Sequence, residues 1–100
     1  GQAFTWEGAL NLRNARHADD ASPLDPSCAC AACRSYSRAY LHHVVKAGEI
    51  IASMLLTWHN LHFFQDLMRA LREAASHGMT AEFAAQFLKR YRGGGTDPEG

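Results

Sequence analysis

The start of the chain alternates between apolar and polar positions, as a β-hairpin does. The alternation runs from Ala3 to Trp6 and again from Leu10 to Arg13, with the turn signal Glu7-Gly8 between them. These residues predict an antiparallel hairpin. A third short strand is expected near Asn14 to His17. From there to Pro26 the chain is acidic and rich in turn residues, which predicts a loop whose acids are solvated.

Helical periodicity follows. Ser35 is placed as the N-cap of a helix with apolar residues at every fourth position, and Gly48 is expected to end or kink it. A long second helix is predicted from Glu49 to about Ser76, with an apolar face wide enough to pack against more than one neighbour. His77-Gly78 should stop this helix, because a cation and a glycine are both favourable at a helix C-terminus.

The remaining residues predict a third helix and a tail. Thr80 is expected to cap the helix, in which Phe83, Phe87 and Tyr91 recur every four residues. Gly93 to Gly100 reads as a flexible tail. The fold class is therefore mainly α with a small antiparallel hairpin. The apolar faces are extensive for 100 residues, which indicates a fragment or an appended subdomain that docks on something larger.

Composition narrows the function classes. Lys plus Arg and Asp plus Glu are balanced at ten each, so no net basic field points to nucleic acid. No apolar stretch is long enough for a membrane span. No signal peptide is visible at the first residues, and the expected location is the cytoplasm.

Three clustered cysteines carry the candidate chemistry. Cys28, Cys30 and Cys33, followed by His59, read as C-x-C-x2-C-x25-H. Three thiolates and one imidazole form the ligand set of a closed tetrahedral zinc site, which leaves no position open for water or substrate. We therefore expect one structural zinc ion. The alternative is a disulfide plus a free thiol, but an odd and tightly clustered set disfavours it.

Spacing leaves the fourth ligand open. His59 is one of five candidates, and the others are rivals on spacing alone. These others are His17, His42, His43 and His62. Two of them, His42 and His43, lie within ten residues of Cys33, as in ordinary zinc fingers.

Four arginines are candidates for contacts with phosphate. Arg34 and Arg38 adjoin the cysteines, where they could also offset the negative charge of a zinc–thiolate site, and Arg13 and Arg16 flank Asn14-Ala15. The alternative is that all four are solvated surface residues.

Three residues on one helix sector, Tyr36, Tyr40 and His43, could form a surface for a protein partner. The alternative is packing within the same chain.

Two segments carry a family resemblance. The run from Pro23 to Arg34 (PLDPSCACAACR) and the run from Tyr36 to His43 (YSRAYLHH) resemble bacterial tRNA-guanine transglycosylase, a family also called queuine tRNA-ribosyltransferase. The resemblance covers residues 1 to 91. Trp58, just before His59, stands where related chains can carry an acid, so the partner that would orient His59 is left open.

The resemblance implies a fold. Members have a (β/α)8 TIM barrel with a zinc-binding subdomain near the C-terminus. Residues 1–60 would be that subdomain, residues 61–92 would be C-terminal helices packed on the barrel, and residues 93–100 would be the flexible tail. The resemblance also implies that the zinc ligands are Cys28, Cys30, Cys33 and His59.

An activity is implied as well. The family exchanges guanine at the tRNA wobble position for preQ1 in queuosine biosynthesis, using two aspartates of the barrel that no residue here matches. This chain alone should be inactive and should contribute structural zinc, tRNA contacts and homodimer contacts, the last through Tyr36, Tyr40 and His43. The alternatives are a free-standing zinc-stabilised protein or RNA interaction module and a non-catalytic paralogue subunit.

Overall fold

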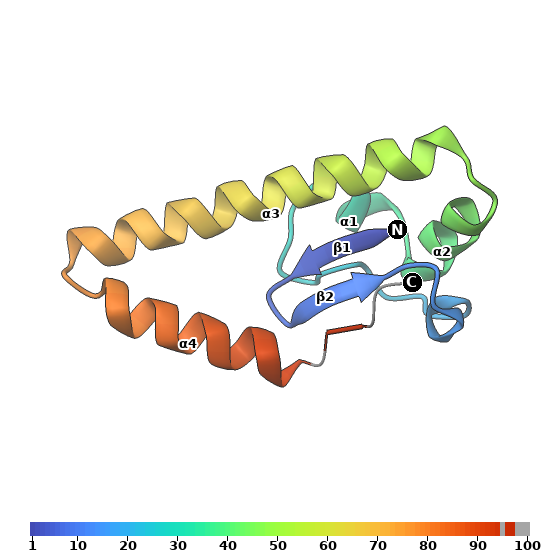
Figure 1. The fold of residues 1–100 in the computed structure, drawn as a ribbon. Helices are drawn as coiled ribbons and strands as arrows, with labels where there is room; N and C mark the ends of the chain where they lie inside the picture. Colours follow the sequence, from blue (N-terminus) through green and yellow to red (C-terminus); the bar gives the residue numbers. More distant parts are fainter. Residues whose placement is uncertain (95, 98–100) are drawn as a thin grey trace.

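The protein is mainly helical, with one small sheet. The computed structural model describes residues 1–94, 96 and 97. Its elements in chain order are β1 (Gln2–Thr5), β2 (Gly8–Asn11), the 3-10 helix η1 (Ala15–His17), α1 (Ala31–Ser35), α2 (Arg38–Lys46), α3 (Ile50–Ser76) and α4 (Thr80–Gly93) (Figure 1).

The expected hairpin is confirmed, with its strands one or two residues earlier than predicted. Strands β1 and β2 pair antiparallel, with Thr5 opposite Gly8. The Thr5 hydroxyl donates to the Gly8 carbonyl at 2.7 Å. Gly8 adopts a φ of 117°, which side chains other than hydrogen disfavour. A glycine therefore permits the tight connection.

Two expectations about secondary structure between the hairpin and α3 are wrong. The segment near Asn14 to His17 forms η1 rather than a strand, because the Asn14 side chain accepts the Arg16 N–H and caps a helical turn. Ser35 is the last residue of α1 and not an N-cap. Ser37 caps α2 instead, since its hydroxyl accepts the Tyr40 N–H at 3.1 Å.

Helix α3 is the longest element and ends as predicted. Its 27 residues stop at His77, and Gly78 follows with a φ of 67°. The N–H of Met79 returns to the Ala74 carbonyl at 2.8 Å, which satisfies the end of the helix. Helix α4 then begins at Thr80 with Met79 in the cap position, so the predicted Thr80 cap is wrong by one residue.

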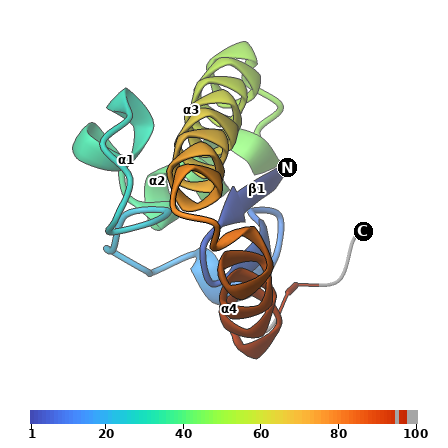
Figure 2. The same cartoon turned by 90° about the vertical axis from the view of Figure 1, so that its left-hand side faces the viewer.

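The hairpin lies between α3 and α4 (Figure 1). Helix α3 contacts β1 and α4 contacts β2. Figure 2 looks at the molecule from the α3–α4 turn and shows α1 to one side of α3. The largest fully buried side chains are Leu12, Leu24, Leu41, His17 and His59. The core therefore gathers at the end of the molecule that holds the cysteines.

The segment after α4 differs from the expected free tail. Gly93 is the last residue of α4, and Asp97 is 7% exposed and hydrogen-bonded to β2. Residues 95 and 98–100 lie outside the described residues. The expected division at residues 60 and 61 falls inside α3 and stays a prediction.

Candidate metal centre

The cysteine segment folds so that its sulfurs point the same way. Cys30 is the N-cap of α1, and its sulfur accepts the Cys33 N–H at 3.4 Å. The Cys28 sulfur accepts the Cys30 N–H at 3.4 Å. Each of these sulfurs therefore takes one backbone N–H of the turn, which fixes the direction of its side chain.

His59 of α3 completes the cluster. Its Nδ1 lies 3.6 Å from Cys28 Sγ, 3.5 Å from Cys30 Sγ and 3.2 Å from Cys33 Sγ. The four ligand atoms all lie within 4.8 Å of one another. Metal–ligand bonds of about 2.3 Å to sulfur and 2.0–2.1 Å to nitrogen place N and S about 3.6 Å apart around a tetrahedral zinc. The donor set and its spacing therefore fit one such ion.

A backbone carbonyl of β1 orients the His59 ring. His59 Nε2 lies 2.7 Å from the Phe4 carbonyl oxygen and donates to it, so Nδ1 keeps its lone pair toward the sulfurs. The neighbouring Asn60 accepts the Phe4 N–H at 3.0 Å and donates to the Gln2 carbonyl at 3.1 Å. Two consecutive residues of α3 thus tie the helix to β1. The partner of His59 that the sequence left open is this carbonyl.

Burial sets the protonation of the cluster. It raises the pKa of Cys28 to about 11 and raises the pKa of Cys33 further. Burial also lowers the pKa of His59, against the Phe4 carbonyl, which favours the protonated ring. The thiols of Cys28 and Cys33 are therefore neutral at pH 7 without an ion, and metal binding must displace their protons.

Asp25 braces the loop that leads to the cysteines. Its carboxylate accepts the Trp6 N–H at 3.0 Å and the Ser27 N–H at 2.8 Å, and the residue is 2% exposed. The expectation of a solvated loop acid is wrong here, because the backbone donors replace water. The sequence did hold a local signal for this contact. An aspartate often accepts the backbone N–H two residues later in an Asx-turn, as Asp25 does from Ser27.

The rival histidines separate clearly. His17 pairs with Asp97, His42 Nδ1 lies 2.7 Å from the Leu12 carbonyl oxygen, and His43 is exposed. His62, one turn after His59, lies at the edge of the cluster. Its Nδ1 is 3.7 Å from Cys28 Sγ but 3.1 Å from Asp66 Oδ2. Among the described residues, the cluster that could hold a metal contains His59 alone of the five.

The predicted phosphate contacts have unequal settings. Arg38 donates to the Pro23 and Leu24 carbonyls at 3.0 and 2.8 Å, so it braces the loop before Cys28. Arg16 is exposed but pairs with Asp97, and Arg13 and Arg34 are exposed as well. Contacts of these four arginines with RNA stay a prediction.

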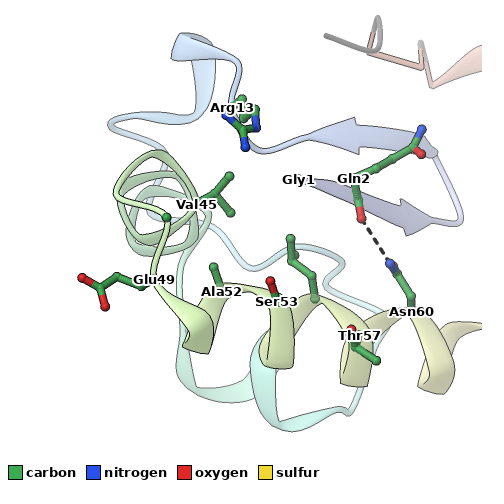
Figure 3. Close-up of a pocket in the computed structure, with 11 residues that line it drawn as sticks. Gly1, Gln2, Arg13, Val45, Glu49, Ala52, Ser53, Thr57 and Asn60 are labelled. Carbon is green, nitrogen blue, oxygen red and sulfur yellow. Dashed lines mark hydrogen bonds between the residues drawn. The ribbon is translucent and has the colours of Figure 1, made fainter.

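Arg13 also lines a cavity of about 320 Å³ at the start of α3 (Figure 3). Polar side chains of α3 face it, and the Asn60–Gln2 hydrogen bond crosses its edge. Its lining includes none of the four cluster residues. The full set is Gly1, Gln2, Arg13, Val45, Gly48, Glu49, Ala52, Ser53, Leu56, Thr57 and Asn60.

The predicted partner surface is partly exposed. Tyr36 and Tyr40 stack with ring centroids 4.9 Å apart, Tyr40 is 38% exposed, and His43 is exposed on the same helix as Tyr40. Tyr36 also packs against the core. The exposed tyrosine edge favours a partner surface, whereas the contact of Tyr36 with the core favours packing within the chain. The dimer contact stays a prediction.

Comparisons with known proteins agree on one family. The family model described as queuine tRNA-ribosyltransferase matches residues 1–93. The queuine tRNA-ribosyltransferase of Dinoroseobacter shibae is 59% identical over 98 residues, which are 98% of this chain and 26% of that protein. Those of Sphingopyxis alaskensis and Zymomonas mobilis are 58% and 52% identical, over 92% and 91% of this chain and 24% of each relative. The chain spans about a quarter of the length of these relatives. In the part of the chain that the structure describes, no helix is long and apolar enough to cross a membrane.

Proposed function

Because the chain belongs to the queuine tRNA-ribosyltransferase family, we propose that it is the zinc-binding C-terminal part of a bacterial tRNA-guanine transglycosylase. The whole protein would exchange guanine at the tRNA wobble position for preQ1, in the cytoplasm. The observation that carries the proposal is a Cys3His cluster set within a chain that matches the family over residues 1–93.

The metal is zinc in a structural role. Cys28, Cys30, Cys33 and His59 would hold it, and the four ligands would leave no coordination position for substrate. A bound ion links the cysteine loop and α1 to the middle of α3. Phe4 extends this link to β1 through the His59 ring. The metal site therefore ties three segments into a rigid unit. These segments are the cysteine loop with α1, the helix α3 and the strand β1.

The exchange chemistry belongs to a (β/α)8 barrel that the rest of the protein forms. Two barrel aspartates would carry the reaction, and residues 61–92 would pack on the barrel. Exposed apolar side chains within residues 61–92 support such docking, since large apolar patches rarely face water. They include Leu61, Phe64, Met68, Met79 and Leu88.

The tRNA and a second copy of the protein are the expected partners. Arg13 and Arg34 are the better candidates for phosphate contacts, because Arg16 and Arg38 already have partners within the chain. Tyr36, Tyr40 and His43 are the candidates for the homodimer contact. The exposed edge of the tyrosine stack supports this role.

Base exchange tests the proposal. The metal-loaded full-length protein that carries this chain should incorporate labelled guanine or preQ1 into a tRNA with guanine at the wobble position, and should leave a tRNA with adenine there unlabelled. The chain alone should give no turnover. A folded, metal-loaded full-length protein that binds tRNA without exchange would favour the non-catalytic paralogue instead.

A further inference from the structure

A second histidine of α3 borders the metal cluster at its least buried ligand. Cys28 is half-buried, whereas the other three ligands are buried. His62 Nδ1 lies 3.7 Å from the Cys28 sulfur. His62 follows His59 by three residues, so the two rings lie on the same side of the helix. The His62 ring is therefore placed against the one ligand of the four that solvent can reach.

Two further residues of α3 orient this ring. Asp66 Oδ2 lies 3.1 Å from His62 Nδ1, and the other carboxylate oxygen accepts from Arg69 at 2.8 Å. An ionised carboxylate can only accept hydrogen bonds, so His62 Nδ1 must carry a proton. This holds whether the ring is neutral or charged. Asp66 therefore directs an N–H group, and not a lone pair, to the nitrogen that lies nearest Cys28.

The Cys28 sulfur is a better acceptor in the metal-loaded protein than in the metal-free one. A thiol is a weak acceptor, but a metal ligand is a thiolate, and hydrogen bonds to ionised groups are roughly twice as strong as those between neutral groups. Three thiolates and one divalent ion also leave one net negative charge at the cluster. A donor at Cys28 therefore stabilises the loaded state more than the empty one.

We propose that His62, oriented by Asp66, is a positioning residue of the metal centre, whose Nδ1–H donates to the Cys28 thiolate and slows release of the ion. The inference rests on the zinc site of the proposed function. Cys28 Sγ also accepts the Cys30 N–H, so it has one donor from its own turn and one from α3. His62 thereby ties the cysteine loop to α3 a second time, without binding the ion itself.

The rate of zinc release tests this role. Release from the zinc-loaded full-length protein is followed with an excess of a chromophoric chelator. His62→Ala should release zinc about three- to tenfold faster, a modest effect because the N–H is shared with Asp66. His62→Asn should restore most of the original rate, since its amide N–H takes the place of Nδ1–H. Gln65→Ala, at an exposed neighbour on α3, is the matched control and should change nothing.

Cobalt substitution separates a hydrogen bond to sulfur from simple packing. A donor lowers the energy of the sulfur lone pair, so its loss should move the sulfur-to-cobalt charge-transfer band to longer wavelength. The cobalt-loaded His62→Ala protein should show this shift, and His62→Asn should keep the original band. If His62 acted only by packing against Cys28, the band would stay in place in both variants.

Three results overturn the proposal while the zinc site stands. These are an unchanged release rate in His62→Ala, faster release without a shift of the cobalt band, and a His62→Asn variant that behaves like His62→Ala. Faster release with a shifted band, both reversed by His62→Asn, supports it. A folded full-length protein that binds no zinc contradicts the proposed function and this inference together, and that result is seen before any variant is compared.

Discussion

The two ends of α3 lie in different surroundings. The five buried residues of this helix all fall between Ala52 and Phe63, beside the hairpin and the cysteine loop. From Phe64 to Ser76 none of its residues is buried, and the same holds for α4 among the described residues. Ring contacts from Trp6 to Phe63 and Phe87 join the two halves.

The difference teaches where the stability of this chain resides. The cysteine half is closed by side chains that bind distant backbone, such as His59 to Phe4 and Arg38 to Leu24. The far half presents Phe64, Met68 and Leu88 to solvent without burying any residue of α3 or α4, whereas the near half of α3 buries five residues, although Ile50 and Trp58 there are exposed. At about 25 cal/mol per Å² of apolar area, a second surface that covers the exposed apolar side chains of the far half would add stability which that half lacks in this chain.

Breaking the metal cluster should have the largest effect. Cys30→Ser should lose the ion and most of the stability of the cysteine half, since a structural zinc contributes about 10–16 kcal/mol and a small domain has only about 5–15 kcal/mol in total. Metal analysis and thermal unfolding measure both losses. Ala29→Ser, at the exposed neighbour, is the matched control. Full metal content in Cys30→Ser would contradict the assignment.

His59 and His62, one helical turn apart, should differ in their effect on zinc affinity. His59→Ala should lower zinc affinity by more than about 100-fold, because it removes a ligand and its link to Phe4. His62→Ala should have a much smaller effect, since His62 also faces Asp66. Competition with a chromophoric chelator measures both affinities. The reverse ranking would make His62 the fourth ligand.

Truncation of an apolar side chain should cost a few kcal/mol more unfolding free energy in the cysteine half than in the far half. Leu41 is fully buried, so Leu41→Ala should cost about 2–5 kcal/mol of unfolding free energy. Leu88 is 42% exposed, so Leu88→Ala should cost about 0.5 kcal/mol or less in the chain alone. In the full-length protein its cost should rise if the far half is covered there. Denaturant unfolding gives the values, and equal costs in the chain alone would remove the contrast.

Loss of the Asp97 contact should cost less than Leu41→Ala, and its cost should depend on pH. Its pKa is lowered in the folded protein, so the contact contributes stability above the unfolded value of about 3.9 and loses it as the pH falls through the folded value. Asp97→Asn should therefore cost about 1–3 kcal/mol at pH 7 and progressively less below pH of about 4. A cost that is independent of pH would show that the charge of Asp97 does not matter.

Local signals predicted the hairpin, the long helix and the cysteine cluster. Alternation, the His77-Gly78 stop and the cysteine spacing are each contained within a few neighbouring residues. The predicted helix start at Ser35 was wrong because Ser35 ends α1 and Ser37 caps α2. The apolar periodicity did not reveal this break. The cysteine turn itself winds into α1, so one predicted helix became two.

Long-range contacts could not be read from spacing. The choice of His59 over His62 depends on how α3 packs on β1, and the family resemblance rather than the residue pattern identified it. Asp25 and Asp97 were expected among solvated acids and in a free tail. Both are buried because backbone N–H groups distant in the sequence reach their carboxylates.

X-ray absorption at the zinc edge tests the central claim most directly. The metal-loaded full-length protein should show one ion per chain with three sulfur ligands at about 2.3 Å and one nitrogen ligand at about 2.0–2.1 Å. His59→Ala should lose the nitrogen contribution while His62→Ala keeps it. A shell with fewer sulfurs, a retained water ligand, or no zinc in folded protein would contradict a closed structural site built from Cys28, Cys30, Cys33 and His59.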